Sequence, residues 1–397
     1  MKSNLIFGNC AELRSEKVDP KASQESLYIG LEHIEQQSLS LTGHGYGSNV
    51  DSQKQKFYKG DILFGKLRPY FRKVVIAPFD GICSTDIWVV KPKSGIDRNF
   101  LFYWMASENF IASSTYASEG GRMPRAKWDW VSKFEIERRE PEEQAAIGTI
   151  LRALDKKIAA NNAISKTLED IAKAIFKSWF IDFDPVKAKM AGETPAGMDA
   201  ATAKLFPDSM EESELGLVPK GWEISSAGAF CPFKYGKALP ASNRIFGAVP
   251  VYGSNGVVGN HNEALTLAPS IVIGRKGTVG TVNLEFGPCW IIDTAFYTST
   301  AEPKDIYLAY LQLKTLGLNE MNSDGAVPGL NRDNAHRDVF TIGTPELRNT
   351  FAEVAHNLFT KISYCHAENR SLTGIRDSLL PRLISGELQI PEEMLAS

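Results

Sequence analysis

The 397-residue sequence lacks any apolar run that approaches the roughly 20 residues of a membrane-spanning helix. Its start, MKSNLIFGNCAELRS, also lacks the apolar core of a secretory signal. The cysteines are odd in number, far apart and never arranged as a CxxC pair, which argues against a disulfide framework. We therefore expect a cytoplasmic globular protein with reduced, mostly buried thiols at Cys10, Cys83, Cys231, Cys289 and Cys365.

Catalytic motifs are missing as well. Residues 60–67 fit GxxxxGK but end in Leu, where a phosphate-binding loop needs Ser or Thr for Mg²⁺, so a strand and turn are favoured. Residues 183–186 (FDPV) lack the second proline and the aromatic residue of an adenine methylase tetrapeptide. Asp61 and Asp86 are interpreted as solvated charges at strand ends. The histidines lack metal-ligand spacing. The sequence predicts no catalytic residue and no metal site.

An excess of basic residues, which contacts to nucleic-acid phosphates normally require, is also absent. The chain has 44 Lys and Arg against 47 Asp and Glu, a formal net charge of -3. The charge is unevenly distributed, because residues 51–73 contain seven basic and two acidic side chains. A local electropositive patch of this kind can bind DNA without a basic average.

The sequence contains a long internal repeat. Pro124 precedes Pro141 by 17 residues, and Pro328 precedes Pro345 by the same 17, so the two copies are offset by 204. The offset holds without a gap through the residues that follow, where the matched pairs are Ile150 and Val354, Leu154 and Leu358, Lys157 and Lys361, Ile158 and Ile362, Leu168 and Leu372, Ile171 and Ile375, and Ile175 and Leu379. One structural plan is therefore used twice.

Each copy combines a β-rich stretch with a long helix. Short runs rich in Val, Ile and aromatic residues predict strands at residues 61–67, 73–77 and 86–90, and again at 270–276, 280–284 and 290–297. The predicted class is α+β, with two β-rich domains in tandem, each followed by a long helix. The predicted boundaries are 1–140 for domain 1, 141–188 for the central helix, 189–219 for a connector, 220–344 for domain 2, and 345–397 for the distal helix and tail.

Both helices have an apolar seam with steps of three and four residues. A helix of about 40 residues is about 60 Å long, too long to be covered by one small β-rich domain. We therefore predict that the two helices pair as an antiparallel coiled-coil spacer. Polar Asn161 and Ser165 interrupt the first seam near its middle. The predicted packing residues are Ile147, Leu151, Leu154, Ile158, Leu168, Ile175, Leu358, Ile362, Leu372 and Leu379.

Loops rich in glycine, basic and aromatic residues occur at corresponding places in the two copies. Arg and Lys pair with guanine edges and phosphates, whereas Asn pairs with adenine. Any single loop is explained better by a solvated turn, but seven of them in a duplicated frame favour a shared DNA-binding surface. The candidate residues are Tyr46, Asn49, Lys66, Arg68, Arg72, Lys73, Arg122, Arg125, Lys127, Lys234, Tyr235, Lys237, Tyr252, Asn255, Arg275, Lys276, Asn331 and Arg332.

Three stretches carry a family resemblance that spans nearly the whole chain. They are residues 141–151 (PEEQAAIGTIL) continuing to 178–189 (SWFIDFDPVKAK), residues 205–256 with LFPDS, ELGLVPKGW and PVYGSNG, and residues 379–388 (LLPRLISGEL). The sequence resembles the specificity subunits of type I restriction-modification enzymes. Residues 5–49 match none of the family's strict motifs.

The resemblance implies a non-catalytic subunit in which each recognition domain reads one half of a split DNA site and the helices set the spacing. It implies two modification subunits, which use S-adenosylmethionine to methylate adenine, and two restriction subunits, which use ATP and Mg²⁺ and cut DNA. No cofactor is then expected in this chain. The alternatives are a coiled-coil scaffold with two protein-binding β domains and a nuclease-methylase fusion, which the missing motifs disfavour.

Overall fold

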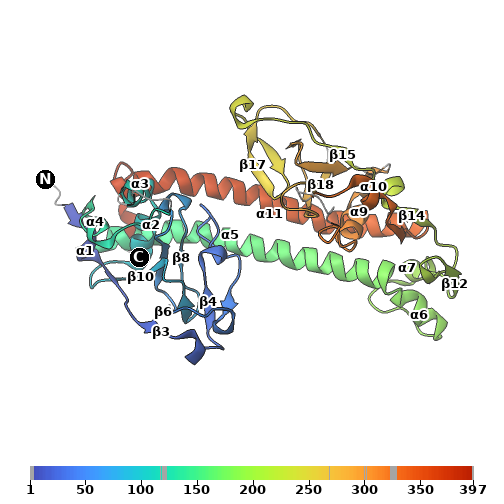
Figure 1. The fold of residues 1–397 in the computed structure, drawn as a ribbon, viewed down its shortest axis with the longest axis horizontal. Helices are drawn as coiled ribbons and strands as arrows, with labels where there is room; N and C mark the ends of the chain where they lie inside the picture. Colours follow the sequence, from blue (N-terminus) through green and yellow to red (C-terminus); the bar gives the residue numbers. More distant parts are fainter. Residues whose placement is uncertain are drawn as a thin grey trace. The chain divides into compact units, whose positions relative to one another are not determined.

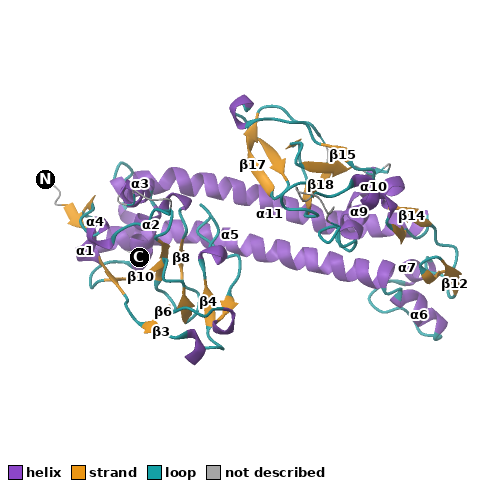
Figure 2. Cartoon of the chain, in the orientation of Figure 1, coloured by secondary structure: helices purple, strands orange, loops and turns teal. Residues whose placement is uncertain are grey.

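The computed structural model describes residues 4–116, 118, 123–267, 269–298, 300, 302–321 and 329–395. The fold is a mixture of helices and strands in two tandem domains with two long helices, as predicted (Figures 1 and 2). The chain divides into two compact units, Met1–Ala160 with Glu368–Ser397, and Asn161–Ala367. The long helices α5 (Pro141–Phe176) and α11 (Pro345–Ser385) each contribute one part to each unit.

Unit 1 contains a four-stranded sheet of order β2-β10-β7-β8 and a five-stranded sheet of order β3-β6-β9-β4-β5. In the second sheet, β4 and β9 pair in parallel. The strands are β1 (Asn4–Ile6), β2 (Ala11–Leu13), β3 (Lys17–Val18), β4 (Leu27–Ile29), β5 (Gly45–Tyr46), β6 (Lys54–Phe57), β7 (Ile62–Gly65), β8 (Val74–Ile76), β9 (Gly81–Cys83), β10 (Ile87–Pro92) and β11 (Glu135–Glu137). The shorter helices are α1 (Phe7–Cys10), α2 (Arg98–Ala106), α3 (Glu108–Tyr116) and α4 (Trp128–Val131).

Unit 2 contains a four-stranded sheet of order β15-β21-β18-β19 and a three-stranded sheet of order β17-β16-β20. The strands are β12 (Met210–Ser213), β13 (Gly216–Pro219), β14 (Ile224–Ser226), β15 (Lys234–Tyr235), β16 (Val249–Gly253), β17 (Gly256–His261), β18 (Ser270–Gly274), β19 (Val282–Glu285), β20 (Trp290–Ile291), β21 (Ala295–Thr298) and β22 (Val339–Thr341). The shorter helices are α6 (Asp184–Met190), α7 (Ala200–Lys204), α8 (Ala227–Phe230), α9 (Ile306–Leu313) and α10 (Arg332–Arg337).

The two units repeat one sheet topology. The order β2-β10-β7-β8 corresponds strand by strand to β15-β21-β18-β19, and the parallel pair β4–β9 corresponds to the parallel pair β16–β20. Our prediction of one strand over residues 290–297 was wrong. Ile292 to Thr294 form a turn between β20 and β21, and these two strands belong to different sheets because their backbones pair with β16 and β18 respectively.

Each β-rich domain has a core around one short apolar helix. In α2, residues 100–106 are all buried, and the Asp97 side chain caps the helix by accepting a hydrogen bond from Phe100 N at 2.8 Å. In α9, all eight residues are buried. A helix that is apolar on every side needs cover on every side. The sheets and the long helices provide this cover within each unit.

Within each unit, parts of α5 and α11 share a hydrophobic core. In unit 1, Ile147 and Leu151 of α5 belong to the same buried cluster as Leu380 and Leu383 of α11. In unit 2, Phe176 of α5 and Phe351 of α11 have ring centroids 6.3 Å apart. None of the ten predicted packing residues is exposed; Ile147, Leu151 and Ile362 are buried, and the others are half-buried.

The polar residues in the middle of the α5 seam are also buried. Asn161 is 1% exposed and Ser165 is 8% exposed. A polar group in a helical seam favours one register over others, at some cost in stability.

A buried tyrosine links each β-rich domain to α5. In unit 1, the Tyr103 hydroxyl donates to Asp155 Oδ2 at 2.5 Å, and Arg376 Nη1 of α11 donates to Asp155 Oδ1 at 2.9 Å. In unit 2, the Tyr310 hydroxyl and Lys314 Nζ both donate to Glu169 Oε1 at 3.0 Å. These bonds supply the partners that the buried polar groups require. They also fix the position of each β-rich domain on α5.

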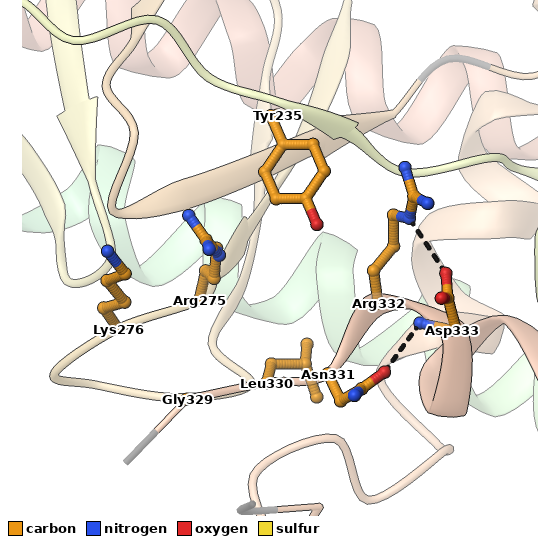
Figure 3. Close-up of a pocket in the computed structure, with 8 residues that line it drawn as sticks. All are labelled: Tyr235, Arg275, Lys276, Gly329, Leu330, Asn331, Arg332 and Asp333. Carbon is orange, nitrogen blue, oxygen red and sulfur yellow. Dashed lines mark hydrogen bonds and ion pairs between the residues drawn. The ribbon is translucent and has the colours of Figure 1, made fainter. Parts of the chain in front are cut away.

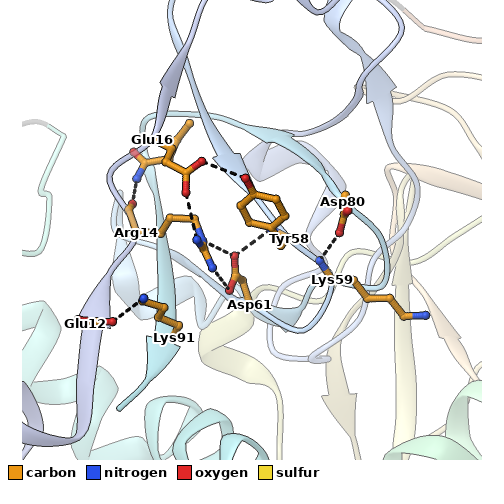
Figure 4. A network of polar contacts seen from close by, with 9 residues as sticks. Glu12, Arg14, Glu16, Tyr58, Lys59, Asp61, Asp80 and Lys91 are labelled. Atoms are coloured by element: carbon orange, nitrogen blue, oxygen red, sulfur yellow. Dashed lines mark hydrogen bonds and ion pairs between the residues drawn. The ribbon is translucent and has the colours of Figure 1, made fainter. Parts of the chain in front are cut away.

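Asp61 is not the solvated strand-end charge that we predicted. It is 6% exposed and accepts from Arg14 Nε at 2.9 Å and from Tyr58 N at 2.9 Å (Figure 4). A buried carboxylate needs a cation and hydrogen-bond donors, and the loop between β6 and β7 supplies them together with Arg14. Strand β7 occupies Ile62–Gly65, and Leu67 forms a β-bridge with Arg125, so a strand lies where the phosphate-binding loop was disfavoured.

All five cysteines are buried and free, as predicted. Burial raises the pKa of both Cys83 and Cys231 to about 12, so these thiols stay protonated and unreactive near neutral pH.

Replacing Asp155 with Ala should lower the stability of unit 1 by about 3–5 kcal/mol, because Arg376 is 3% exposed and would lose a buried partner. The matched control is Lys157→Ala, which removes an exposed ion pair with Glu368 and should cost at most about 1 kcal/mol. Urea unfolding followed by tryptophan fluorescence measures both. Equal costs for the two variants would contradict the role of Asp155.

Glu169 should make unit 2 sensitive to acid. Burial alone would raise its pKa, but hydrogen bonds and charge from Lys314 and Lys173 outweigh burial and lower the pKa to about 2. Because this folded-state pKa lies below the ordinary value of 4.5, the carboxylate stabilises the fold above pH 4.5 and loses this effect as the pH falls toward 2.

Glu169→Gln should therefore destabilise the protein at pH 6 and flatten the fall in unfolding free energy between pH 4.5 and 2. Denaturant titrations at several pH values test this. Glu353→Gln, at an exposed position of α11, is the control and should leave the profile unchanged. Identical profiles for Glu169→Gln and the parent would refute the prediction.

Candidate nucleic-acid interface

The candidate interface in unit 2 lies where two loops are joined by backbone hydrogen bonds. Arg275 N donates to Thr294 O at 3.0 Å, and Leu330 N donates to Arg275 O at 2.8 Å. Lys276 and Gly329 form an isolated β-bridge. The loop after β18 is thereby fixed beside the segment that leads into α10.

These loops and β15 enclose a cavity of about 440 Å³ (Figure 3). Its lining residues are Tyr235, Arg275, Lys276, Gly329, Leu330, Asn331, Arg332 and Asp333. Five of the predicted candidates, Tyr235, Arg275, Lys276, Asn331 and Arg332, therefore lie together. Three cations and one carboxylate line the cavity, so its net charge is positive.

Tyr235 lies between two guanidinium groups. The Cζ of Arg275 lies 4.8 Å from the centroid of the Tyr235 ring, and the Cζ of Arg332 lies 5.2 Å from it (Figure 3). Arg275 Nη1 also donates to Asp293 O at 3.1 Å, and Arg332 Nε donates to Asp333 Oδ1 at 3.1 Å. Cation–π contact with the ring holds both guanidinium groups and leaves other N–H groups of each for a ligand.

Asn331 has a structural task in addition to any contact with a ligand. Its Oδ1 accepts from Asp333 N at 2.9 Å and from Asn334 N at 3.1 Å, so it caps α10. Both lone pairs of Oδ1 are therefore used. A bidentate contact with adenine needs this acceptor together with the amide donor, so the cap disfavours adenine reading by Asn331.

Unit 1 has the same backbone frame at its candidate interface. Lys66 N donates to Asp86 O at 2.9 Å, Ala126 N donates to Lys66 O at 2.9 Å, and Leu67 and Arg125 form the corresponding isolated bridge. Lys66 thus corresponds to Arg275, Asp86 to Thr294 and Arg125 to Gly329. The frame is shared, but the side chains at corresponding positions differ.

Arg125 is paired with a carboxylate in this frame. Arg125 Nε donates to Asp86 Oδ1 at 2.7 Å and Nη2 donates to Oδ2 at 3.1 Å. Asp86 was not among the predicted interface residues. The sequence does not reveal Asp86, because the offset between the two copies changes from 204 at Pro124 to 208 at Asp86. The correspondence between Asp86 and Thr294 is therefore visible only in the structure.

The loop after Leu67 has a strained backbone. Arg68 and Arg72 flank a short 3-10 helix, Pro69–Phe71, and both adopt left-handed conformations, with φ of 51° and 52°. Such conformations in residues other than glycine cost free energy and cluster at binding sites. Arg72 Nη2 donates to Ala106 O at 3.0 Å, and Lys73 Nζ donates to Leu31 O at 2.5 Å. Burial also lowers the pKa of Lys73. Arg72 and Lys73 therefore hold the loop in place.

The remaining candidates lie outside these two clusters or have other bonds. Tyr46 and Asn49 lie together, because Tyr46 N donates to Asn49 Oδ1 at 2.9 Å. The Tyr252 hydroxyl donates to Glu285 at 2.6 Å. Arg122 lies outside the described residues. Exposed candidates with no assigned role are Lys127, Lys234, Lys237 and Asn255.

The described residues contain no group of three or more His, Cys, Asp or Glu side chains placed to hold a metal ion. Within the same residues, no helix combines the length and the apolar character needed to cross a membrane.

Comparisons with known proteins point to one family. Residues 11–170 match the type I restriction modification DNA specificity domain. The chain is 29% identical to the type I restriction enzyme HindI specificity subunit of Haemophilus influenzae, over 84% of this chain and 88% of that protein. It is 24% identical to the MjaIX specificity subunit of Methanocaldococcus jannaschii, over 85% of this chain and 79% of that protein.

A solved structure shares the fold. The type I restriction-modification S subunit from M. genitalium matches with a TM-score of 0.54 and 17% identity, over 98% of this chain and 96% of that chain. Over most of its length the chain is thus similar to specificity subunits of type I restriction-modification systems, the family that its sequence motifs resemble. These similarities support a DNA specificity subunit and give no support to the protein-binding scaffold alternative.

Proposed function

We propose that residues 1–140 and 220–344 are two target-recognition domains and that each reads one half of a bipartite DNA site. The observation that carries this proposal is the shared frame, in which Lys66 and Arg275 begin corresponding loops. Each frame presents arginines beside the segment that leads into a short helix, α4 or α10. Two copies of one frame with different side chains suit a site whose halves differ in sequence.

The pocket in recognition domain 2 is a site for a DNA phosphate. A phosphate projects from the duplex and fits a concave pocket, whereas base edges lie on the floor of a groove and need side chains that project. Arg275, Lys276 and Arg332 supply positive charge and several N–H donors against the single carboxylate of Asp333. Cation–π contact with Tyr235 holds the guanidinium groups in place before DNA arrives, which reduces the entropy lost on binding.

The helices act as an antiparallel coiled-coil spacer. This is supported by contacts within each unit, because Ile147 and Leu151 share a core with Leu380 and Leu383, while Phe176 contacts Phe351. The N-terminal part of α5 thus packs with the C-terminal part of α11, and the C-terminal part of α5 packs with the N-terminal part of α11. The spacer region comprises residues 141–188, which contain α5 and the start of the separate helix α6, and residues 345–397, which contain α11. Residues 189–219 connect the first part to recognition domain 2.

The chain works in the cytoplasm as part of a larger enzyme. In this proposal it joins two modification subunits, which carry S-adenosylmethionine, and two restriction subunits, which carry ATP and Mg²⁺. Selection of bound duplexes from a randomised library by the assembled modification complex tests the proposal. Enrichment of two defined half-sites at a fixed gap is expected, and enrichment of one continuous site or of no site would refute it.

Arg275→Ala and Arg332→Ala should each weaken DNA binding to all sequences alike. A plot of log affinity against log salt concentration has a negative slope, and each lost phosphate contact should make this slope less steep by about 1. Fluorescence anisotropy with the assembled complex, over a series of salt concentrations, gives this slope. Arg138→Ala, an exposed residue that pairs with Glu140, is the control. A change in base preference with an unchanged slope would contradict the phosphate site.

Insertion of four residues near Asn161, about one helical turn, should alter the preferred gap or abolish activity, because it changes the length of the spacer. If the helices set the distance, the half-sites should lie about one duplex turn apart, roughly 34–36 Å. Methylation protection across duplexes with varied gaps measures the preference. A control insertion after Gly192, in the connector, should leave it unchanged. An unaltered gap after the helical insertion would exclude the ruler.

A further inference from the structure

Arg125 has one edge of its guanidinium occupied and one edge open. An arginine side chain has five N–H donors arranged as two forks, one formed by Nε and Nη2 and the other by Nη1 and Nη2. Asp86 accepts from the first fork at 2.7 and 3.1 Å. Among the described residues, the second fork of Arg125 has no partner, and the side chain is 48% exposed.

The backbone that carries Arg125 is fixed on both sides. Arg68 N donates to Pro124 O at 2.8 Å, and Ala126 N donates to Lys66 O at 2.9 Å. Asp86 is also held, since its carbonyl accepts from Lys66 N at 2.9 Å. A fixed backbone and a bidentate carboxylate together set the direction of the open fork before any ligand binds.

We propose that the open fork of Arg125 reads a guanine in the half-site of recognition domain 1, and that Asp86 is the residue that positions it. This inference rests on the proposed function. In the major groove, guanine presents two acceptors, O6 and N7, which match a fork of two donors. Adenine presents one acceptor and one donor at the same places, so its amino group would face an N–H of Arg125.

The local charge favours a base over a phosphate as the partner of Arg125. Asp86 neutralises the positive charge of Arg125, which weakens attraction to a phosphate but leaves two directed hydrogen bonds. The pocket of recognition domain 2 shows the opposite arrangement, with three cations against one carboxylate. Thr294 and Gly329 occupy the positions of Asp86 and Arg125 there, so this guanine reader is confined to recognition domain 1.

The test begins with site selection by the assembled modification complex containing the parent chain, Arg125→Lys, Arg125→Ala or Asp86→Thr. The parent should require guanine at one position, and the Arg125 variants should lose this preference by roughly 5- to 150-fold. Asp86→Thr copies the residue at the corresponding position of domain 2. It should relax the same position while overall affinity stays equal or rises, because one negative charge is removed.

A second arm replaces the selected guanine with 7-deazaguanine, which lacks the N7 acceptor but pairs normally with cytosine. The parent complex should lose affinity for the modified duplex, whereas the Arg125→Ala complex should bind both duplexes equally. Arg332→Ala is the matched control, because it should weaken binding to both duplexes and still respond to the substitution. Thermal unfolding identifies any variant that fails to fold. If Arg125→Ala fails to fold, the proposal is decided by how 7-deazaguanine changes the affinity of the parent and Arg125→Lys complexes.

The outcomes separate the two levels of the proposal. If the parent complex selects no bipartite site, the proposed function fails. If it selects one, but Arg125→Ala retains every base preference and only lowers the salt dependence, Arg125 contacts a phosphate and the inference fails alone. A selected half-site without guanine, or an equal response of parent and Arg125→Ala complexes to 7-deazaguanine, would also overturn it.

Discussion

The burial of two long apolar seams is the constraint on which the rest of the structure depends. Neither α5 nor α11 can bury its seam within one unit, so each helix contributes one part to the core of unit 1 and one part to that of unit 2. Each β-rich domain is then joined to α5 by a buried tyrosine, Tyr103 through Asp155 and Tyr310 through Glu169. These hydrogen bonds are directional and fix each β-rich domain at one position along α5, which apolar packing alone does not do. A recognition domain fixed on a helix in this way presents its loops in a defined orientation.

Duplication of the backbone frame allows the two domains to differ in their chemistry without any change of fold. The bonds that join the loop after β7 to the segment before α4 recur between the loop after β18 and the segment before α10. At corresponding positions, however, Asp86 and Arg125 are replaced by Thr294 and Gly329. One domain gains a directed, neutral pair, and the other gains an open pocket with an excess of cations. Sequence specificity and electrostatic affinity are different tasks, and they require different arrangements of the same kinds of side chain.

The sequence predicted the repeat, the α+β class and the long helices, because these depend on periodicity and on an ungapped offset of 204. It also placed Arg275 and Arg332 among the candidate DNA-binding residues, and the structure brings both to one ring, Tyr235. It could not predict the burial of Asp61, because the cation that pairs with it, Arg14, lies 47 residues earlier in the chain. The split between β20 and β21 was missed for a related reason, since apolar periodicity is the same on both sides of the turn.

The partner of an arginine decides what that arginine can recognise, and the sequence does not reveal the partner. Arg125 and Arg332 are both exposed or half-exposed arginines beside the start of a short helix, and by sequence they received the same interpretation. In the structure, a bidentate carboxylate directs Arg125, whereas an aromatic ring and a single bond to Asp333 hold Arg332. A carboxylate removes charge and fixes direction, while a ring fixes the plane and keeps the charge. The first arrangement suits a base edge and the second a phosphate, so in our proposal the two halves of the DNA site are held by different physical means.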